Sequence, residues 1–314
     1  MTNVHGKRLL ITGVSGLLGS NLAYCLRDDY EVCGLYHTHE LDMDKVSAYK
    51  CDLRERPQVE EVMRSLSPDI VVHCAAQTNV EDCEGNPEKT EQINVSATRN
   101  IVDSLSGRPV KLVYISTDLV YDGIKGNFSE DDPAVPANVY ARSKLGGEKE
   151  VLKVPGALVL RTNFFGWSVF KERSLGEWVI SNLKAQQEIK GFTDSKFSAI
   201  YTFDLAELMD EAIQKDLSGI YNLGSGSSLS KYDFAITIAG ELGLNADLVT
   251  PTSIDNFGFK ARRSKDLSLV VSKLENDAGR PSVLIERSIE RFTGDFRAGK
   301  LDEFHSFARQ RIKG

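Results

Sequence analysis

Residues 7–19 read KRLLITGVSGLLG, an apolar run of β type that ends in a Gly-x-x-Gly-x-x-Gly turn. A helical pattern over 20–28 follows, and a second apolar run, Glu31–Tyr36, comes after it. In a strand–turn–helix–strand unit, glycines let the backbone approach a diphosphate, while the start of the helix offers free N–H groups and a favourable dipole. An ordinary tight turn is the simpler interpretation, but this context favours a dinucleotide-binding unit.

The end of the second strand distinguishes the two nicotinamide dinucleotides. A carboxylate there would bind the adenosine ribose and repel a 2′-phosphate, whereas this chain reads Tyr36-His37-Thr38-His39 and has no carboxylate before Glu40. The sequence therefore predicts NADP, with NAD as the alternative, although no arginine stands at the expected place. His37 and Thr38 are expected to donate to the phosphate. Since the His37/His39 pair has no further ligand beside it, we expect no metal site.

Other residues expected at the cofactor follow later apolar runs. Asp52, in the strand-like stretch 50–53, is placed to meet an adenine amino group, although a plain surface aspartate is the competing interpretation. Small or polar residues after the run 69–74 suit a strand end that passes beneath a cofactor. The predicted cofactor contacts are Gly13, Ser15, Gly16, Leu17, Leu18, Gly19, Tyr36, His37, Thr38, Asp52, Leu53, Cys74, Ala75, Ala76, Thr78, Ser116, Tyr140 and Lys144.

Strand and helix patterns alternate through the first half of the chain. This alternation predicts an α/β fold with a doubly wound parallel sheet, a Rossmann fold, whose ligand lies across the C-terminal ends of the strands. His73 is expected to be a packed core histidine, and Asn94 a hydrogen-bonded polar hub behind the site. Glu81–Asn86 is expected to be a solvated acidic loop. Further strands are expected at 69–74, 110–115 and 157–161, and helices at 59–66, 87–105 and 139–152.

Beyond Gly166 the alternation loosens. We expect a dinucleotide-binding domain over 1–165, to which 192–218 returns, and a smaller C-terminal α/β substrate lobe over 166–191 and 219–314. Helices are expected at 175–184, 203–214, 231–242, 271–279 and 283–292, and short strands at 198–201 and 219–223.

Bulk properties narrow the class of protein. The chain has 314 residues, 41% hydrophobic and 26% charged, with a net charge of −7. This balance disfavours a nucleic-acid surface or a polybasic membrane surface, and no apolar run approaches the ~20 residues of a membrane span. The N-terminus does not resemble a signal peptide, and five cysteines without metal-type spacing suggest a reducing compartment. We therefore expect a cytoplasmic protein.

The chemistry is expected between Lys111 and Lys144. Ser116-Thr117-Asp118 closes an apolar run, and Tyr140 and Lys144 stand four residues apart in a helical pattern, which places them on one face. A phenol with a pKa of ~10 is a poor acid unless a neighbouring cation favours its anion. Tyr140 would then exchange a proton with a carbonyl or alcohol oxygen that the hydroxyl of Thr117 also contacts. Alone, the Tyr-x-x-x-Lys pattern is ordinary for an amphipathic helix.

Together, the glycine turn, Ser116-Thr117-Asp118 and Tyr140-x-x-x-Lys144 resemble the extended short-chain dehydrogenase/reductase family. Within it, 116–123 (STDLVYDG), 128–133 (FSEDDP) and 138–145 (NVYARSKL) are similar to the dTDP-4-dehydrorhamnose reductases. The resemblance implies an NAD(P)-dependent reductase in which Tyr140 protonates the C4 ketone of a nucleotide-linked sugar. Lys144 would lower the pKa of Tyr140 and hold the nicotinamide ribose, and Thr117 would contact the carbonyl. The expected substrate contacts are Thr78, Val80, Thr117, Asp118, Asn163 and Trp167.

Two departures bear on the sugar: Leu119 stands where those reductases usually have Tyr, and 191–198 differs from their usual wording. The related dehydratases place Asp-Glu after the Thr, whereas this chain has Asp118-Leu119, which argues against water elimination. Two alternatives stay open: a nucleotide-sugar 4-epimerase with retained NAD, and a non-catalytic NADP-binding subunit like the regulatory β subunit of methionine adenosyltransferase. The helices at 87–105 and 139–152 would suit a homodimer.

Overall fold

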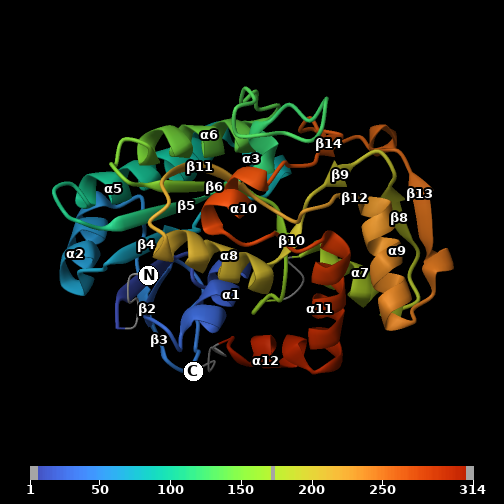
Figure 1. Cartoon of the computed structure of the whole chain (residues 1–314), viewed down its shortest axis with the longest axis horizontal. Coiled ribbons are helices and arrows are strands. Elements are labelled where there is room, and N and C mark those ends of the chain that lie inside the picture. The colour runs from blue at the N-terminus through green and yellow to red at the C-terminus, as the bar shows by residue number, and fades with distance from the viewer. Residues whose placement is uncertain (1–5, 171–173, 309–314) are drawn as a thin grey trace.

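A seven-stranded parallel sheet forms the centre of the computed structural model, which describes residues 6–170 and 174–308 (Figure 1). The strand order is β11-β6-β5-β4-β1-β2-β3, and every neighbouring pair is parallel. The predicted doubly wound parallel sheet is therefore confirmed. The strands are β1 (Arg8–Thr12), β2 (Glu31–Tyr36), β3 (Val46–Lys50), β4 (Ile70–His73), β5 (Lys111–Thr117), β6 (Leu158–Thr162) and β11 (Gly219–Leu223).

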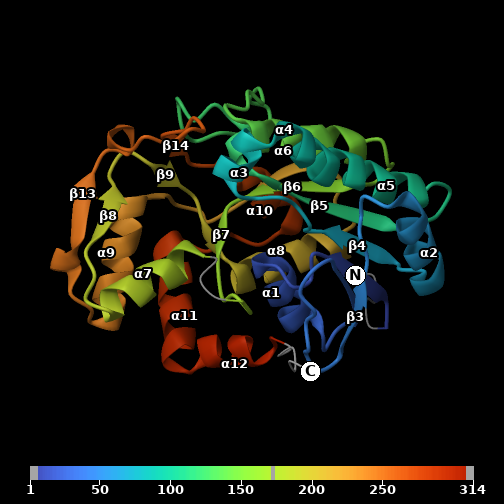
Figure 2. The ribbon, with the colours of Figure 1, turned by 180° about the vertical axis from the view of Figure 1, so that it is seen from behind.

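Helices cover both faces of the sheet because successive side chains of a strand point to opposite sides. In β1, Leu9 and Ile11 pack in one core cluster together with side chains of α1 and α8. Leu10 between them packs in a second cluster with Met63 and Ile101. Figure 2 shows the second layer, with α5 and α6 above the strands. The covering helices are α1 (Leu17–Leu26), α2 (Arg56–Leu66), α5 (Ala97–Ser104), α6 (Val139–Val151) and α8 (Thr202–Gln214).

The region between β4 and β5 differs from prediction at one point. Glu81–Asn86 is not a loop, because most of it lies in α3 (Val80–Gly85), which Asn79 caps through hydrogen bonds from two backbone N–H groups. The long helix expected at 87–105 is present as α4 (Pro87–Glu91), a π-helical turn at Gln92–Ser96, and α5. Such π turns are rare and often lie near functional sites.

Short strands and five helices form a lobe beside the sheet (Figure 1). The strand Gly219–Leu223, which we assigned to this lobe, pairs with β6 in the main sheet, so the predicted boundary at 219 is wrong. None of the described helices has the length and apolarity of a membrane span. The lobe elements are β7 (Phe164–Phe165), α7 (Leu175–Lys184), β8 (Ile189–Phe192), β9 (Lys196–Phe197), β10 (Ile200–Tyr201), β12 (Leu229–Ser230), α9 (Lys231–Leu242), β13 (Val249–Thr252), β14 (Asp266–Leu267), α10 (Ser272–Ala278), α11 (Ile285–Arg297) and α12 (Lys300–Ser306).

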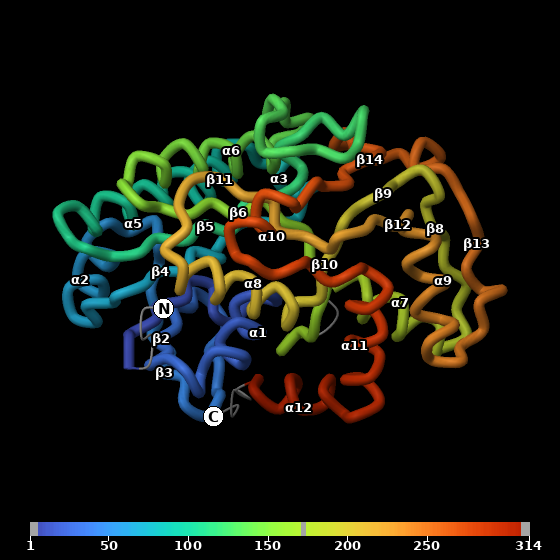
Figure 3. Tube along the Cα trace, in the orientation of Figure 1, coloured from blue at the N-terminus to red at the C-terminus, as the bar shows by residue number. Residues whose placement is uncertain are grey.

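The long segment between β5 and α6 is tied to the lobe. It begins with a 3₁₀ turn at Asp118–Val120 and runs beside the segment that contains β14, as Figure 3 shows. The backbone of Phe128 accepts a hydrogen bond from Val270 at 2.8 Å and donates one to Ser268 at 2.9 Å. These contacts hold the segment over the C-terminal edge of the sheet.

Candidate active site

Helix α6 carries Tyr140 and Lys144 and is fixed at its start and along its length. The side chain of Asn138 caps it by accepting a hydrogen bond, at 2.9 Å, from the backbone N–H three residues further on. The helix packs closely on β5 because Gly147 has no side chain: a Cβ atom there would lie 2.1 Å from the hydroxyl oxygen of Tyr114. The cap and this close packing set the position of Tyr140 and Lys144 relative to the sheet.

The phenol of Tyr140 lies near Thr117 and Asp118, which are both buried. Burial raises the pKa of Tyr140 above its usual value, the Asp118 carboxylate raises it further, and hydrogen bonding with Thr117 opposes the rise. We expected the Lys144 cation to lower this pKa. The pKa of Tyr140 is nevertheless raised overall, because burial dominates. A phenol with a raised pKa stays protonated at neutral pH, which is the form that donates a proton.

Lys144 is a buried cation with an aromatic neighbour. It is 3% exposed, and its ammonium nitrogen lies 4.0 Å from the centroid of the Tyr114 ring, which is a cation–π contact. Burial lowers the pKa of Lys144 to about 7, while Cys74 and Glu148 act in the opposite direction. The coupling to Cys74 places Lys144 near the end of β4, where the sequence predicts the cofactor.

Asp118 connects the sheet edge to the lobe. Its carboxylate accepts hydrogen bonds from Asn163 at 2.8 Å and from Thr117 at 3.2 Å, and burial raises its pKa to about 6. Lys231, the first residue of α9, is also close, since Asp118 raises its pKa while burial and Arg263 lower it. Lys231 and Arg263 were not predicted from the sequence. No motif surrounds either residue in the lobe, so the sequence does not show which site its side chain faces.

A cavity of about 490 Å³ opens between the segment after β5 and the lobe. Residues 122–124 line one side, and Phe257, Phe259, Arg262 and Arg263 line the other. The two phenylalanine rings stack with centroids 5.6 Å apart, and the guanidinium of Arg263 lies 4.7 Å from the Phe259 ring. Exposed aromatic faces beside cations suit a flat, anionic ligand.

The glycine turn fits a diphosphate. Gly13 has φ 67°, and a Cβ atom there would lie 2.9 Å from Cα of Ala75. Gly16 caps α1 without a side chain, and the first turn of α1 contains no acidic residue, so no carboxylate of that turn competes with an anion. Leu18 is 4% exposed and packs in the core, so its side chain is not available to a ligand. Ser15 and Leu17 are partly exposed.

The stretch after β4 is held from behind by Asn94. The side chain of Asn94 accepts a hydrogen bond from the backbone N–H of Gln77 at 2.7 Å and donates to its carbonyl at 3.0 Å. It also donates to the hydroxyl of Ser143 on α6 at 2.8 Å. The polar hub predicted for Asn94 is confirmed.

Other predicted contacts lie in the stretch after β4. Thr78 is exposed and Val80 is partly buried, so both are accessible. Cys74, Ala75 and Ala76 are partly buried as well.

Two predicted contacts have a structural role instead. Trp167 is fully buried and stacks on Phe292 with centroids 4.0 Å apart, so its prediction as a substrate contact is wrong. The hydroxyl of Ser116 donates to Glu148 at 2.5 Å, and Glu148 pairs with Arg161 at 2.8 Å. Because this ion pair is buried and uses the Ser116 hydroxyl, the side chain of Ser116 supports the end of β5 rather than contacting a cofactor. Likewise, His73 is buried between two threonine hydroxyls, as a packed core histidine.

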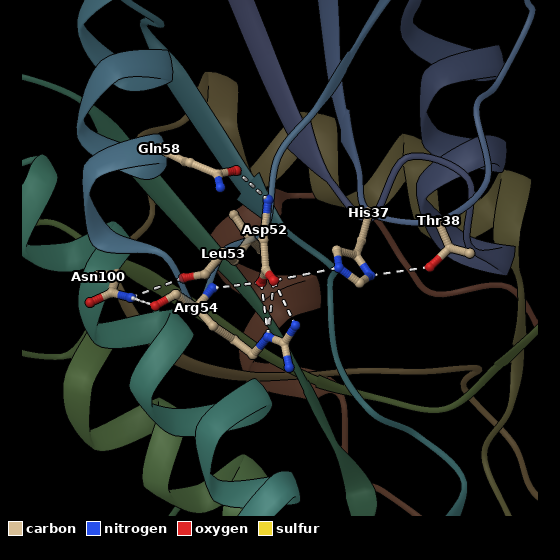
Figure 4. Close-up of polar contacts among 7 residues, drawn as sticks. All are labelled: His37, Thr38, Asp52, Leu53, Arg54, Gln58 and Asn100. Atoms are coloured by element: carbon tan, nitrogen blue, oxygen red, sulfur yellow. Dashed lines mark hydrogen bonds and ion pairs between the residues drawn. The ribbon is translucent and has the colours of Figure 1, made fainter.

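At the other end of the sheet edge, residues predicted for the adenosine half gather beside β2 and β3 (Figure 4). His37 contacts Thr38, with 3.1 Å between Nδ1 and Oγ1, and its Nε2 lies 3.5 Å from a carboxylate oxygen of Asp52. The same oxygen accepts from Arg54 at 2.6 Å. Arg54 was absent from the predicted site, because its contact follows from the turn after β3 and not from a motif. The neighbouring Leu53 is partly buried, as is Tyr36 at the end of β2.

Comparison with known proteins gives one consistent family. The family model "RmlD substrate binding domain" matches residues 7–297. The Haloferax volcanii protein "Probable low-salt glycan biosynthesis reductase Agl14" is 32% identical, over 86% of this chain and 91% of its own. The zebrafish (Danio rerio) methionine adenosyltransferase 2 subunit beta is 30% identical, over 86% of this chain and 84% of its own. Bacillus anthracis dTDP-4-dehydrorhamnose reductase, solved with NADP, superposes with a TM-score of 0.80 at 27% identity, over 92% of this chain and 99% of its own.

These matches cover the sheet, the glycine turn and the lobe together. The class of enzyme predicted from the motifs, an NAD(P)-dependent reductase of the extended short-chain type, is the class to which this family belongs. The chain is a member of the RmlD substrate-binding domain family.

Proposed function

We propose that this protein is an NADP-preferring oxidoreductase that reduces the 4-keto group of a nucleotide-linked deoxysugar. The observation that carries the proposal is the position of the Tyr140 phenol, which lies beside the Thr117 hydroxyl at the edge of the sheet where the glycine turn also lies. The reductase with NADP among its relatives supports the same reaction and cofactor.

Proton delivery follows from the raised pKa of Tyr140. The glycine turn would hold the cofactor, which would supply the hydride to the carbonyl carbon. As charge builds on the carbonyl oxygen, Thr117 stabilises it by a hydrogen bond and Tyr140 gives up its proton, because an alkoxide is a far stronger base than a phenolate. A phenol that stays neutral until the oxygen becomes basic avoids losing its proton to solvent beforehand.

Lys144 stabilises the phenolate that remains on Tyr140. Its pKa of about 7 reflects burial, and a new negative charge nearby favours the ammonium form again. The two side chains therefore change in a complementary way. Tyr140 is neutral before the proton transfer, and the ammonium form of Lys144 is most strongly favoured after it. Contact with a ribose hydroxyl, the second role expected of Lys144, is compatible with its position near the end of β4.

The nucleotide of the substrate is proposed to occupy the cavity on the lobe side. Phe257 and Phe259 offer faces for a base, and Arg262 and Arg263 offer donors for a diphosphate. Lys231 interacts electrostatically with Arg263 of this cavity and with Asp118, and Asp118 with Asn163 is suited to the sugar hydroxyls. Base and sugar would thus contact opposite sides of the same opening.

A 4-epimerase is less well supported. It would retain a tightly held NAD, and the end of β2 lacks the carboxylate that binds the adenosine ribose of NAD. The second candidate is a regulatory subunit, because a subunit of methionine adenosyltransferase is 30% identical over most of its length. In that role the protein would bind NADP and a larger partner without turning over a sugar.

The test is NADPH oxidation, followed by absorbance, with dTDP-, UDP- and GDP-linked 4-keto-6-deoxysugars. We expect turnover with one of the nucleotides and weaker turnover with the same nucleotide after Arg263→Gln. Tight NADPH binding without turnover on any of them would contradict the reductase and favour the regulatory subunit.

A further inference from the structure

The turn between β3 and α2 brings an arginine to the end of β2, where a dinucleotide fold holds the adenosine ribose. Figure 4 shows the side chains of Arg54 and His37 both directed at the carboxylate of Asp52. Both reach the same carboxylate oxygen, Arg54 at 2.6 Å and His37 at 3.5 Å. Thr38 contacts His37 from the other side. The donors of two separate segments therefore converge on one point.

The backbone of this turn is fixed while the side chain of Arg54 is accessible. Asn100 on α5 donates to the carbonyl oxygens of Leu53 and Arg54 at 3.0 and 3.1 Å, and the side chain of Gln58 accepts from the N–H of Asp52 at 3.1 Å. The side chain of Arg54 is 40% exposed, whereas that of Asp52 is 20% exposed. An anchored backbone with an exposed side chain allows the guanidinium to change partner without moving the turn.

The guanidinium of Arg54 is already bound to an anionic group. The carboxylate of Asp52 is held by Arg54, whose hydrogen bonds lower the pKa of Asp52 to about 2. Asp52 therefore stays ionised at neutral pH and competes with a phosphate for the guanidinium. A guanidinium binds phosphate through two parallel hydrogen bonds as well as it binds a carboxylate.

We propose that Arg54 is the residue that recognises the 2′-phosphate of NADP, and that Asp52 competes with the phosphate for its guanidinium. The inference rests on the proposed function, because it assumes that the adenosine half lies at the end of β2. With a 2′-phosphate present, Arg54 leaves Asp52 for the phosphate, and His37 and Thr38 complete the site. Without one, Arg54 stays on Asp52 and the ribose is still accepted.

The test measures binding and needs no sugar substrate. Calorimetry on the full chain compares adenosine 2′,5′-bisphosphate with adenosine 5′-monophosphate, which differ by the 2′-phosphate alone. The dissociation constant of the monophosphate divided by that of the bisphosphate reports phosphate recognition. We expect Arg54→Gln to reduce this ratio by about tenfold to a hundredfold, the range for hydrogen bonds to a charged group. Asp52→Asn should raise it, because the competitor is lost.

Arg56→Gln is the matched control, since Arg56 lies two residues away and pairs with Glu60 and Asp103 instead. We expect it to leave the ratio unchanged. An unchanged ratio in Arg54→Gln, or an equal loss in Arg56→Gln, would overturn the assignment of Arg54 while leaving the reductase intact. If the unmodified protein binds neither ligand, the cofactor site itself fails, and with it both proposals.

Discussion

The two ends of the sheet edge use charge in different ways. At the catalytic end, Lys144 and Asp118 are 3% and 0% exposed, and burial shifts the pKa of both toward neutral pH. At the adenosine end, the side chains of His37 and Arg54 are 60% and 40% exposed. Buried charges have large effects on stability and reactivity, whereas exposed ones are screened by water. The catalytic end is therefore rigid and energetically demanding, and the adenosine end can exchange partners.

The largest effect on stability is expected from Glu148→Ala. Glu148 and Arg161 form a buried ion pair that also holds Ser116, and removal of one partner leaves the other charge unpaired. We expect the free energy of unfolding to fall by about 3–5 kcal/mol, measured by denaturant titration.

The double variant Glu148→Leu with Arg161→Met provides the control, because it removes both charges at similar volume. Its loss should be much smaller than that of the single variant. Equal losses in the two variants would show that packing, and not charge, dominates at this position.

The next effect concerns Asp118, whose pKa is about 6 in the folded chain and 3.8 in the unfolded reference. Below pH 3.8 the carboxyl is neutral in both states. As pH rises from 3.8 to about 6, the unfolded chain loses its proton first. The free energy of unfolding therefore falls, by up to about 3 kcal/mol above pH 6. We expect Asp118→Asn to melt at a higher temperature than the unmodified protein at pH 7.5, with the difference vanishing near pH 4. A difference that does not depend on pH would contradict the shift.

Much of the fold follows from local pattern. The glycine turn, the strand Glu31–Tyr36 and helix α6 were predicted because apolar periodicity and glycine spacing act over short distances. The lobe was predicted less completely. Strands such as β8 and β13 were missed because they are short and pair only with each other, and the boundary at 219 failed because pairing of β11 with β6 is a long-range contact.

The candidate site divides in the same way. Thr117, Tyr140 and Asn94 were identified from motif and from the cost of burying a polar group. Trp167 was assigned wrongly. An aromatic residue after a strand gives the same sequence pattern whether it packs on Phe292 or on a ligand. The partners that complete both ends, Lys231 and Arg54, come from three-dimensional proximity. The homodimer expected through 87–105 and 139–152 stays a prediction.

The smallest effect is expected at the adenosine end. Arg54→Gln removes an ion pair with Asp52 that is partly exposed, so the free energy of unfolding should change by less than about 1 kcal/mol. The melting temperature of Arg54→Gln should change with salt concentration as little as that of Arg56→Gln does. A loss comparable to that of Glu148→Ala would show that the turn is structural, and the contrast between the two ends would disappear.

Proton donation by Tyr140 is tested most directly by Tyr140→Phe, with NADPH binding and sugar-dependent NADPH oxidation measured on the same preparation. NADPH binding should persist, because the glycine turn is unchanged, and turnover should fall by about 10²-fold or more, the usual contribution of a general acid. Turnover near that of the unmodified protein would contradict the account.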